Sequence, residues 1–181
     1  VLVKAYTAEK QIVSSAELAG FYNGQETFLR TSFKDYDILY IDKLVNFIFN
    51  YPKIKKAKIK LESYEGKKII ITGSYGKTST KVLFNQILSN FYNVSKTPKS
   101  YNTVLGITKY INDTNIHLYD YLILEYGASK INDIDKLLEL SIPSVAVVTD
   151  IGLMHLSTFK TLDNIINEKM KLALKASLVI L

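Results

Sequence analysis

The sequence KIIITGSYGKTS, residues 68–79, decides the fold of this chain. Its first five residues form an almost continuous apolar run, which is typical of a strand buried on both faces of a parallel sheet. A glycine-containing turn follows, and apolar residues at Val82, Leu83, Ile87, Leu88 and Phe91 then predict a helix over 77–91. A strand, a glycine turn and a helix in this order are the usual setting of a phosphate-binding loop.

The turn predicts that a nucleotide binds through its phosphates. Glycines allow backbone N–H groups to surround phosphate oxygens, and the helix N-terminus adds positive potential. We expect Lys77 to reach the β and γ phosphates and the Thr78 hydroxyl to ligate Mg²⁺. The longer form of this motif has a glycine where Ile71 stands, so the other interpretation is a glycine turn with a solvated lysine. The residues assigned to the nucleotide are Gly73, Ser74, Tyr75, Gly76, Lys77, Thr78 and Ser79.

The chain downstream alternates between apolar runs and helical patterns. Strands are expected over 121–126, 144–149 and 178–181, with helices over 131–140 and 162–176. This alternation predicts an α/β fold, a parallel sheet flanked by helices, whose ligands lie at the carboxyl ends of the strands. We expect this domain to cover residues 64–181, after a small N-terminal α+β segment over 1–63. Within that segment, residues 1–6 are expected to form a strand, and residues 33–51 a strand followed by a short helix.

Polar side chains stand where two later strands end. Glu125 lies inside the apolar run 121–126, and a buried carboxylate is costly unless it is paired, for example with Lys77, or bound to a metal. Asp150 and His155 follow the next strand. A lone histidine is usually structural, but polar groups at the ends of successive parallel strands, around one phosphate loop, favour a functional site.

Composition excludes several classes of protein. The 181 residues contain no cysteine, which excludes a disulfide scaffold, a thiolate zinc site and a cysteine nucleophile. Much of the net charge of +6 comes from residues 52–68, where 7 Lys and 2 Glu leave an excess of 5. We interpret this lysine cluster as a solvated linker or a protected edge strand, and expect no nucleic-acid partner. The chain begins at Val1 and ends inside an apolar run, so we expect a fragment at both ends.

Four segments resemble the central ATPase domain of the Mur ligases, which build the peptide of bacterial peptidoglycan. TGSYGKTS at 72–79 is similar to the phosphate loop of that family, and TPKSYNTVLGI at 97–107 to its substrate-facing segment. LEYGASKINDI at 124–134 resembles its metal-binding segment, and VTDIGLMHLSTF at 148–159 its histidine segment. The second and third segments most resemble the branch that adds D-alanyl-D-alanine. The resemblance implies that 64–181 is the ATPase domain and that 1–63 includes part of a UDP-sugar-binding domain.

The resemblance also implies an activity and roles for single residues. It implies an ATP- and Mg²⁺-dependent ligase that joins a UDP-MurNAc-peptide to D-Ala-D-Ala through an acyl phosphate. Its catalytic residues would be Lys77, Glu125, His155 and Lys169; its metal ligands would be Thr78, Glu125 and His155; Asn102 and Thr103 would lie near the substrate. Lys169 matches a lysine that the family often carries in carbamylated form. For that position Lys171, two residues further on, is the alternative, and a solvated helix face is the other interpretation of both lysines.

Two other functions share features of this sequence. A folylpolyglutamate synthase-like ligase would have the same ATPase domain, and a non-catalytic ATP-binding module would have the same phosphate loop. No apolar run reaches the roughly 18 residues that span a membrane. We expect a cytoplasmic protein, without a membrane span in this chain, that acts as a monomer on small-molecule substrates.

Overall fold

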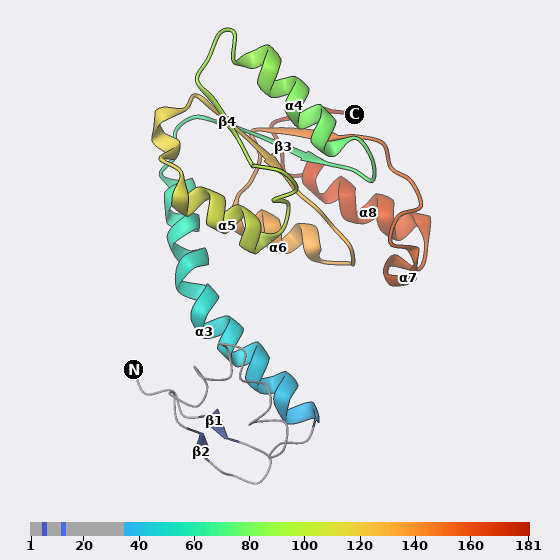
Figure 1. Ribbon diagram of the computed structural model, residues 1–181. Coiled ribbons are helices and arrows are strands. Elements are labelled where there is room, and N and C mark those ends of the chain that lie inside the picture. The colour runs from blue at the N-terminus through green and yellow to red at the C-terminus, as the bar shows by residue number, and fades with distance from the viewer. Residues whose placement is uncertain (1–4, 7–11, 14–34) are drawn as a thin grey trace. The chain divides into compact units, whose positions relative to one another are not determined.

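A computed structural model of the chain describes residues 5–6, 12–13 and 35–181 (Figure 1). The chain divides into two compact units, Val1–Pro52 and Lys53–Leu181. In the first unit, strand β1 (Ala5–Tyr6) pairs antiparallel with strand β2 (Ile12–Val13). The strand expected over 1–6 is therefore described at its last two residues, and residues 1–4 lie outside the described part. The division into domains 1–63 and 64–181 stays a prediction.

Helix α3 (Asp35–Glu62) corrects two expectations from the sequence. No strand precedes a short helix over 35–51, because all of these residues are helical. The lysine cluster is neither a linker nor an edge strand in its first part, since residues 53–62 form the last turns of the same helix. There, Ala57 and Leu61 are fully buried in the core of the second unit, while most of the lysines around them are exposed. The spacing of four residues between the two buried positions is that of one helix face.

The second unit is built on a five-stranded sheet in the order β4-β5-β3-β6-β7. All neighbouring strands are parallel. This confirms the predicted α/β fold, and the central strand β3 is the apolar run that opens the motif. The strands are β3 (Lys67–Thr72), β4 (Val94–Lys96), β5 (Tyr121–Glu125), β6 (Val145–Val148) and β7 (Leu178–Ile180).

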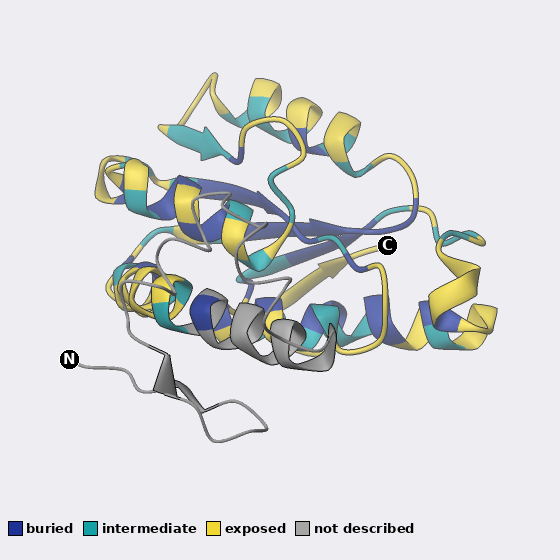
Figure 2. Ribbon diagram, turned by 60° about the horizontal axis from the view of Figure 1, so that its bottom comes forward, coloured by how far each residue is buried: buried dark blue, intermediate teal, exposed yellow. Residues whose placement is uncertain are grey.

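Helices cover both faces of this sheet (Figures 1 and 2). Helix α4 (Lys77–Leu88) lies on one face, and α5 (Val104–Asp113), α6 (Asp133–Leu140) and α8 (Leu162–Ala173) lie on the other. The short helices η1 (Ile116–Leu118) and α7 (Leu156–Phe159) complete the unit. None of the described helices is long and apolar enough to cross a membrane. Strand β4 and helix α5 were not expected from the sequence.

Alternating strand residues form two cores. Ile70, Leu122 and Leu124 join the larger cluster, on the side of α5, α6 and α8. Ile69, Ile71 and Ile123 join a smaller cluster, against which Phe84 and Leu88 of α4 pack. The helix predicted here is confirmed, but the predicted apolar stripe is mostly wrong, because Val82, Leu83 and Ile87 are exposed.

A buried carboxylate from α8 caps the N-terminus of helix α6. Glu168 is 1% exposed, and its Oε1 and Oε2 accept hydrogen bonds from the backbone N–H groups of Ile134 (2.7 Å) and Asn132 (3.1 Å). The ammonium of Lys171 lies 2.7 Å from Oε2. A carboxylate at a helix N-terminus satisfies N–H groups that have no partner inside the helix, and it matches the positive end of the dipole.

Glu168→Ala is therefore expected to lower the free energy of unfolding by about 3 kcal/mol, because it leaves the buried N–H of Ile134 and the partly buried N–H of Asn132 without an acceptor. Urea unfolding of the purified protein measures this loss. The matched control is Glu139→Ala, an exposed glutamate on α6, which should change stability by less than about 0.5 kcal/mol. Equal losses in the two variants would contradict the capping role.

Candidate functional site

The phosphate loop connects β3 to α4 and leaves several backbone donors unused. Gly73 (φ 148°) and Gly76 (φ 79°) have positive φ, which L side chains rarely adopt. Gly76 is the N-cap of α4 and provides no side-chain cap. Within residues 35–181, the N–H groups of Gly73, Tyr75 and Gly76 have no hydrogen-bond partner. Unused N–H groups at an uncapped helix N-terminus are suited to bind an anion.

Two lysines meet at one carbonyl group of this loop. Lys77 Nζ donates to the carbonyl oxygens of Gly73 and Ser74, each at 2.9 Å, and Lys169 Nζ reaches the same Gly73 oxygen at 2.9 Å. Lys169 comes from α8 and is 3% exposed, so it does not lie on a solvated helix face. Two ammonium groups this close together repel each other and would gain from an anion between them.

Burial is the main cause that lowers the pKa of both lysines. Burial and, secondly, the neighbouring Lys77 lower the pKa of Lys169 from 10.5 to about 8, against the opposing influence of Glu168. Burial also lowers the pKa of Lys77, while Glu125 acts in the other direction. The alternative Lys171 is engaged elsewhere, with Asp135 at 2.5 Å and Glu168 at 2.7 Å. Of the two lysines considered for the carbamylated position, Lys169 and Lys171, the structure brings Lys169 to the phosphate loop.

Glu125 joins three of the four sequence segments. It is the last residue of β5 and is 1% exposed. Its Oε2 accepts a hydrogen bond from the Thr78 hydroxyl at 3.0 Å, and its Oε1 accepts one from the Asn102 side-chain amide at 3.2 Å. The backbone N–H of Gly127 in turn donates to the Asn102 carbonyl at 2.8 Å. Segments that are far apart in sequence therefore converge on one buried carboxylate.

The cation that pairs with Glu125 is Lys81, and it was missed from the sequence. Lys81 Nζ lies 3.0 Å from Glu125 Oε2, and both side chains are 2% exposed. The same ammonium donates to the carbonyl oxygen of Lys99, in the segment that leads to Asn102. The expected pairing of Glu125 with Lys77 is not formed, since Lys77 bonds to loop carbonyls. Lys81 lies four residues after Lys77, so the two lysines share one face of the helix. This spacing was the signal in the sequence that could have identified Lys81.

A cavity of about 560 Å³ lies beside the groups that surround Glu125. Among the predicted residues that line it are Asn102, Thr103 and His155. Asn102 and Thr103 contribute from the start of α5, where the Thr103 hydroxyl accepts the N–H of Gly106 as N-cap. His155 contributes from the N-cap of α7, with φ 56°. Lys77 reaches the same cavity. Lys130, Asp133 and Lys136 also line it and were not predicted.

The residues present fit a magnesium ion that binds together with a nucleotide. Mg²⁺ prefers oxygen ligands and is usually held by one or two carboxylates together with substrate phosphates. The Thr78 hydroxyl and the Glu125 carboxylate supply such oxygens side by side. In the described part of the chain, no three His, Asp or Glu side chains gather as a metal site by themselves. The ion would therefore need oxygens from phosphate or water.

Three further predicted positions lie around the loop. Tyr75 is 52% exposed, with its ring close to Gly152, and Ser79 is exposed on the first turn of α4. Ser74 is buried, and its N–H and hydroxyl donate to the carbonyl oxygens of Asp150 and Gly152 at 2.7 and 3.0 Å. The carboxylate of Asp150 itself is exposed. The loop is thus attached to the segment that follows β6.

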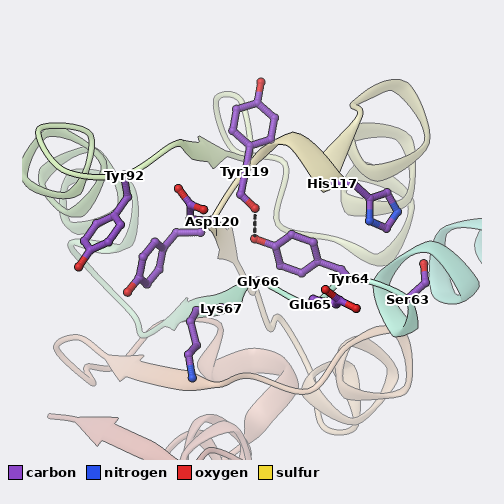
Figure 3. Close-up of a pocket in the computed structure, with 10 residues that line it drawn as sticks. Ser63, Tyr64, Glu65, Gly66, Lys67, Tyr92, His117, Tyr119 and Asp120 are labelled. Atoms are coloured by element: carbon purple, nitrogen blue, oxygen red, sulfur yellow. Dashed lines mark hydrogen bonds between the residues drawn. The ribbon is translucent and has the colours of Figure 1, made fainter.

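A second depression, of about 620 Å³, lies at the opposite edge of the sheet (Figure 3). It is formed where β3 and β5 begin. The Tyr64 hydroxyl donates to the carbonyl oxygen of Tyr119 at 3.0 Å, and the rings of Tyr92 and Tyr121 lie 4.9 Å apart between centroids. Ligands of parallel sheets lie at the carboxyl ends of the strands. This depression is therefore separate from the phosphate loop and contains none of the predicted site residues.

Comparison with known proteins gives the same family from sequence and from structure. The family described as the Mur ligase middle domain matches residues 71–180. UDP-N-acetylmuramoyl-tripeptide–D-alanyl-D-alanine ligase from Borreliella burgdorferi is 34% identical over 116 residues, which are 64% of this chain and 25% of that protein. The enzyme of the same name from Bacillus subtilis is 32% identical over 118 residues, with the same two coverages.

Solved structures with the same arrangement include the MurF ligase of Thermotoga maritima in complex with ADP. That structure has a TM-score of 0.65 and 34% identity, and the match covers 70% of this chain and 29% of that one. MurF from Acinetobacter baumannii has a TM-score of 0.64 and 28% identity, with coverages of 68% and 27%. The chain spans about a quarter of the length of the curated relatives it matches.

Proposed function

The chain belongs to the Mur ligase family, and from that premise we propose that it forms the ATP-binding part of a ligase that adds D-alanyl-D-alanine to a UDP-MurNAc-peptide. The observation that supports this best is the meeting of three family segments at Glu125. Thr78 of the phosphate loop and Asn102 of the substrate-facing segment both donate to that carboxylate. A turn with a solvated lysine would not bring these side chains together.

The reaction that we propose has two steps. A carboxylate of the UDP-MurNAc-peptide attacks the γ-phosphorus of ATP, the bond to ADP breaks, and an acyl phosphate forms. The amine of D-Ala-D-Ala then attacks the acyl carbon, and phosphate leaves with the bond electrons. A free carboxylate is a poor electrophile at neutral pH, so the phosphoryl group makes amide formation feasible. Catalysis of phosphoryl transfer rests largely on positioning and charge neutralisation.

The residues of the chain take roles that fit these steps. We propose that Lys77 moves from the loop carbonyls to the β and γ phosphates, since an incoming anion is a stronger partner for an ammonium than a carbonyl is. Gly73, Tyr75 and Gly76 offer N–H groups, and Asn102 and Thr103 face the transferred group or the substrate. Mg²⁺ bound through Thr78, Glu125 and His155 would neutralise phosphate charge. Location in the cytoplasm and a monomeric state stay predictions.

We also propose that Lys169 is carbamylated. Carbamate forms from the neutral amine, and a pKa near 8 leaves a substantial neutral fraction at pH 8, where an ordinary lysine is almost fully charged. Carbamylation would turn the repulsion between Lys169 and Lys77 into attraction.

This modification has a direct measurement. With ¹³C-bicarbonate, the carbamate resonance of the protein is expected to grow as the pH rises through about 8 at constant dissolved CO₂. Lys169→Ala should remove the resonance, and Lys171→Ala should retain it. A resonance that persists in Lys169→Ala would contradict the assignment.

The experiment that tests the function measures ADP release by the whole protein. Release is expected to require both UDP-MurNAc-tripeptide and D-Ala-D-Ala. Release that depends on a folate and glutamate would instead support a folylpolyglutamate synthase-like ligase. Nucleotide binding without any substrate-dependent release would support a non-catalytic ATP-binding module. The names of the relatives favour the first outcome.

A further inference from the structure

Thr149, the residue directly after strand β6, forms hydrogen bonds to backbone carbonyl groups of the phosphate loop. Thr149 Oγ1 donates to the carbonyl oxygen of Tyr75 at 2.6 Å and lies 3.1 Å from that of Thr72. The Thr149 N–H also donates to Thr72 at 2.8 Å. One residue outside the loop thus contacts the carbonyl groups of the last residue of β3 and of the third residue after it.

The fit between Thr149 and the loop is close. A Cβ added to Gly73 would lie 1.9 Å from Thr149 Oγ1, so only a glycine allows the hydroxyl to approach this part of the backbone. A Cβ added to Gly76 would lie 3.9 Å from Thr149 Cβ, which is ordinary van der Waals contact. The threonine side chain therefore lies against both glycines of the loop.

The direction of a carbonyl group determines where the next N–H points. In a trans peptide the C=O and the N–H point in opposite directions, and no cis peptide occurs among the described residues. Because Thr149 binds the Tyr75 carbonyl, the N–H of Gly76 points away from β6. The N–H of Gly73 is oriented in the same way through the Thr72 carbonyl. These are two of the loop donors that have no partner in the part of the chain that is described.

We propose that Thr149 is a positioning residue for nucleotide binding: its hydroxyl fixes the Tyr75–Gly76 peptide so that the Gly76 N–H is available to a phosphate. This inference rests on the proposed function, because it takes the loop to bind a nucleotide. The lysines at the loop, Lys77 and Lys169, bind other carbonyl groups, of Gly73 and Ser74. Thr149 thus binds two carbonyl groups, those of Thr72 and Tyr75, that neither lysine contacts.

The test compares Thr149→Val, which keeps the shape and loses the hydroxyl, with Thr149→Ser, which keeps the hydroxyl. ADP affinity, measured calorimetrically with Mg²⁺, is expected to fall about threefold to tenfold in Thr149→Val, the value of one hydrogen bond. Thr149→Ser should bind within about twofold of the original protein. Thr108→Val is the matched control, because the buried Thr108 hydroxyl on α5 has no hydrogen-bond partner among the described residues and lies outside the site.

A second readout does not depend on nucleotide. The amide ¹H–¹⁵N resonance of Gly76 in the nucleotide-free protein should shift in Thr149→Val and stay near its original position in Thr149→Ser. An unshifted Gly76 resonance, or unchanged ADP affinity in Thr149→Val, overturns the proposal. If the original protein binds no ADP, the proposed function fails. The Gly76 resonance then still decides whether Thr149 orients the loop.

Discussion

Lys77→Ala is expected to reduce substrate-dependent ADP release by the whole protein at least about 10²- to 10³-fold, the range observed when one preorganised charge or donor is removed from a transition state. Lys77 stands at the start of α4, beside N–H groups that have no partner within residues 35–181. Removing its ammonium leaves the negative charge that develops on the phosphates without the side-chain cation that we assign to them. Single-turnover measurement of ADP formation with saturating substrates gives the effect on the chemical step.

The control for this prediction lies at the other end of the same strand. Lys67 is the first residue of β3 and is exposed, at the edge opposite the phosphate loop (Figure 3). Lys67→Ala should release ADP at the original rate. Full activity in Lys77→Ala would contradict the assignment of the loop, whereas equal losses in both variants would point to a general effect of charge.

Lys81→Met is expected to lower the free energy of unfolding by about 3–5 kcal/mol, because it leaves the Glu125 carboxylate buried without its countercharge. The methionine side chain has a similar length, so the change removes charge more than volume. Chemical denaturation monitored by circular dichroism measures the loss.

A double variant separates the lost charge pair from lost packing. Lys81→Met with Glu125→Gln removes both charges and should be more stable than Lys81→Met alone, since no buried ion is left unpaired. Lys109→Met, on the exposed side of α5, should change stability by less than about 0.5 kcal/mol. Glu125→Gln alone completes the cycle, and if its loss and that of Lys81→Met simply add in the double variant, the pair has no coupling and the interpretation is wrong.

Local pattern was sufficient for strands β3, β5, β6 and β7 and for helices α4, α6 and α8 of the second unit, but not for β4 and α5. Apolar runs predict the strands around β3 because a strand covered on both faces needs apolar side chains on both. The same logic is weaker for α4. Its apolar residues Leu83 and Ile87 are exposed, and the residue that it buries is Lys81. A charged residue is assigned to the surface unless its partner is known, and that partner, Glu125, is 44 positions away in sequence.

The N-terminal expectations failed where periodicity was ambiguous. Residues 35–51 are rich in aromatic and aliphatic side chains, which suit a strand as well as a helix, and the lysine cluster that follows suits a linker. In the structure α3 continues through Pro52 to Glu62. The contacts of Ala57 and Leu61 with the core of the second unit stabilise its last turns, and such contacts override local preference.

The sequence by itself determined the parallel α/β fold and the family, and it predicted the phosphate loop, because these depend on residue types and short spacings within single segments and on the order of those segments. Only the tertiary structure decided which charges meet. It pairs Glu125 with Lys81 and not Lys77, brings Lys169 to the carbonyl of Gly73, and lays Thr149 against the loop. These contacts join residues that come from different strands and helices. Their partners are therefore set by the packing of the sheet and its helices, which no local pattern contains.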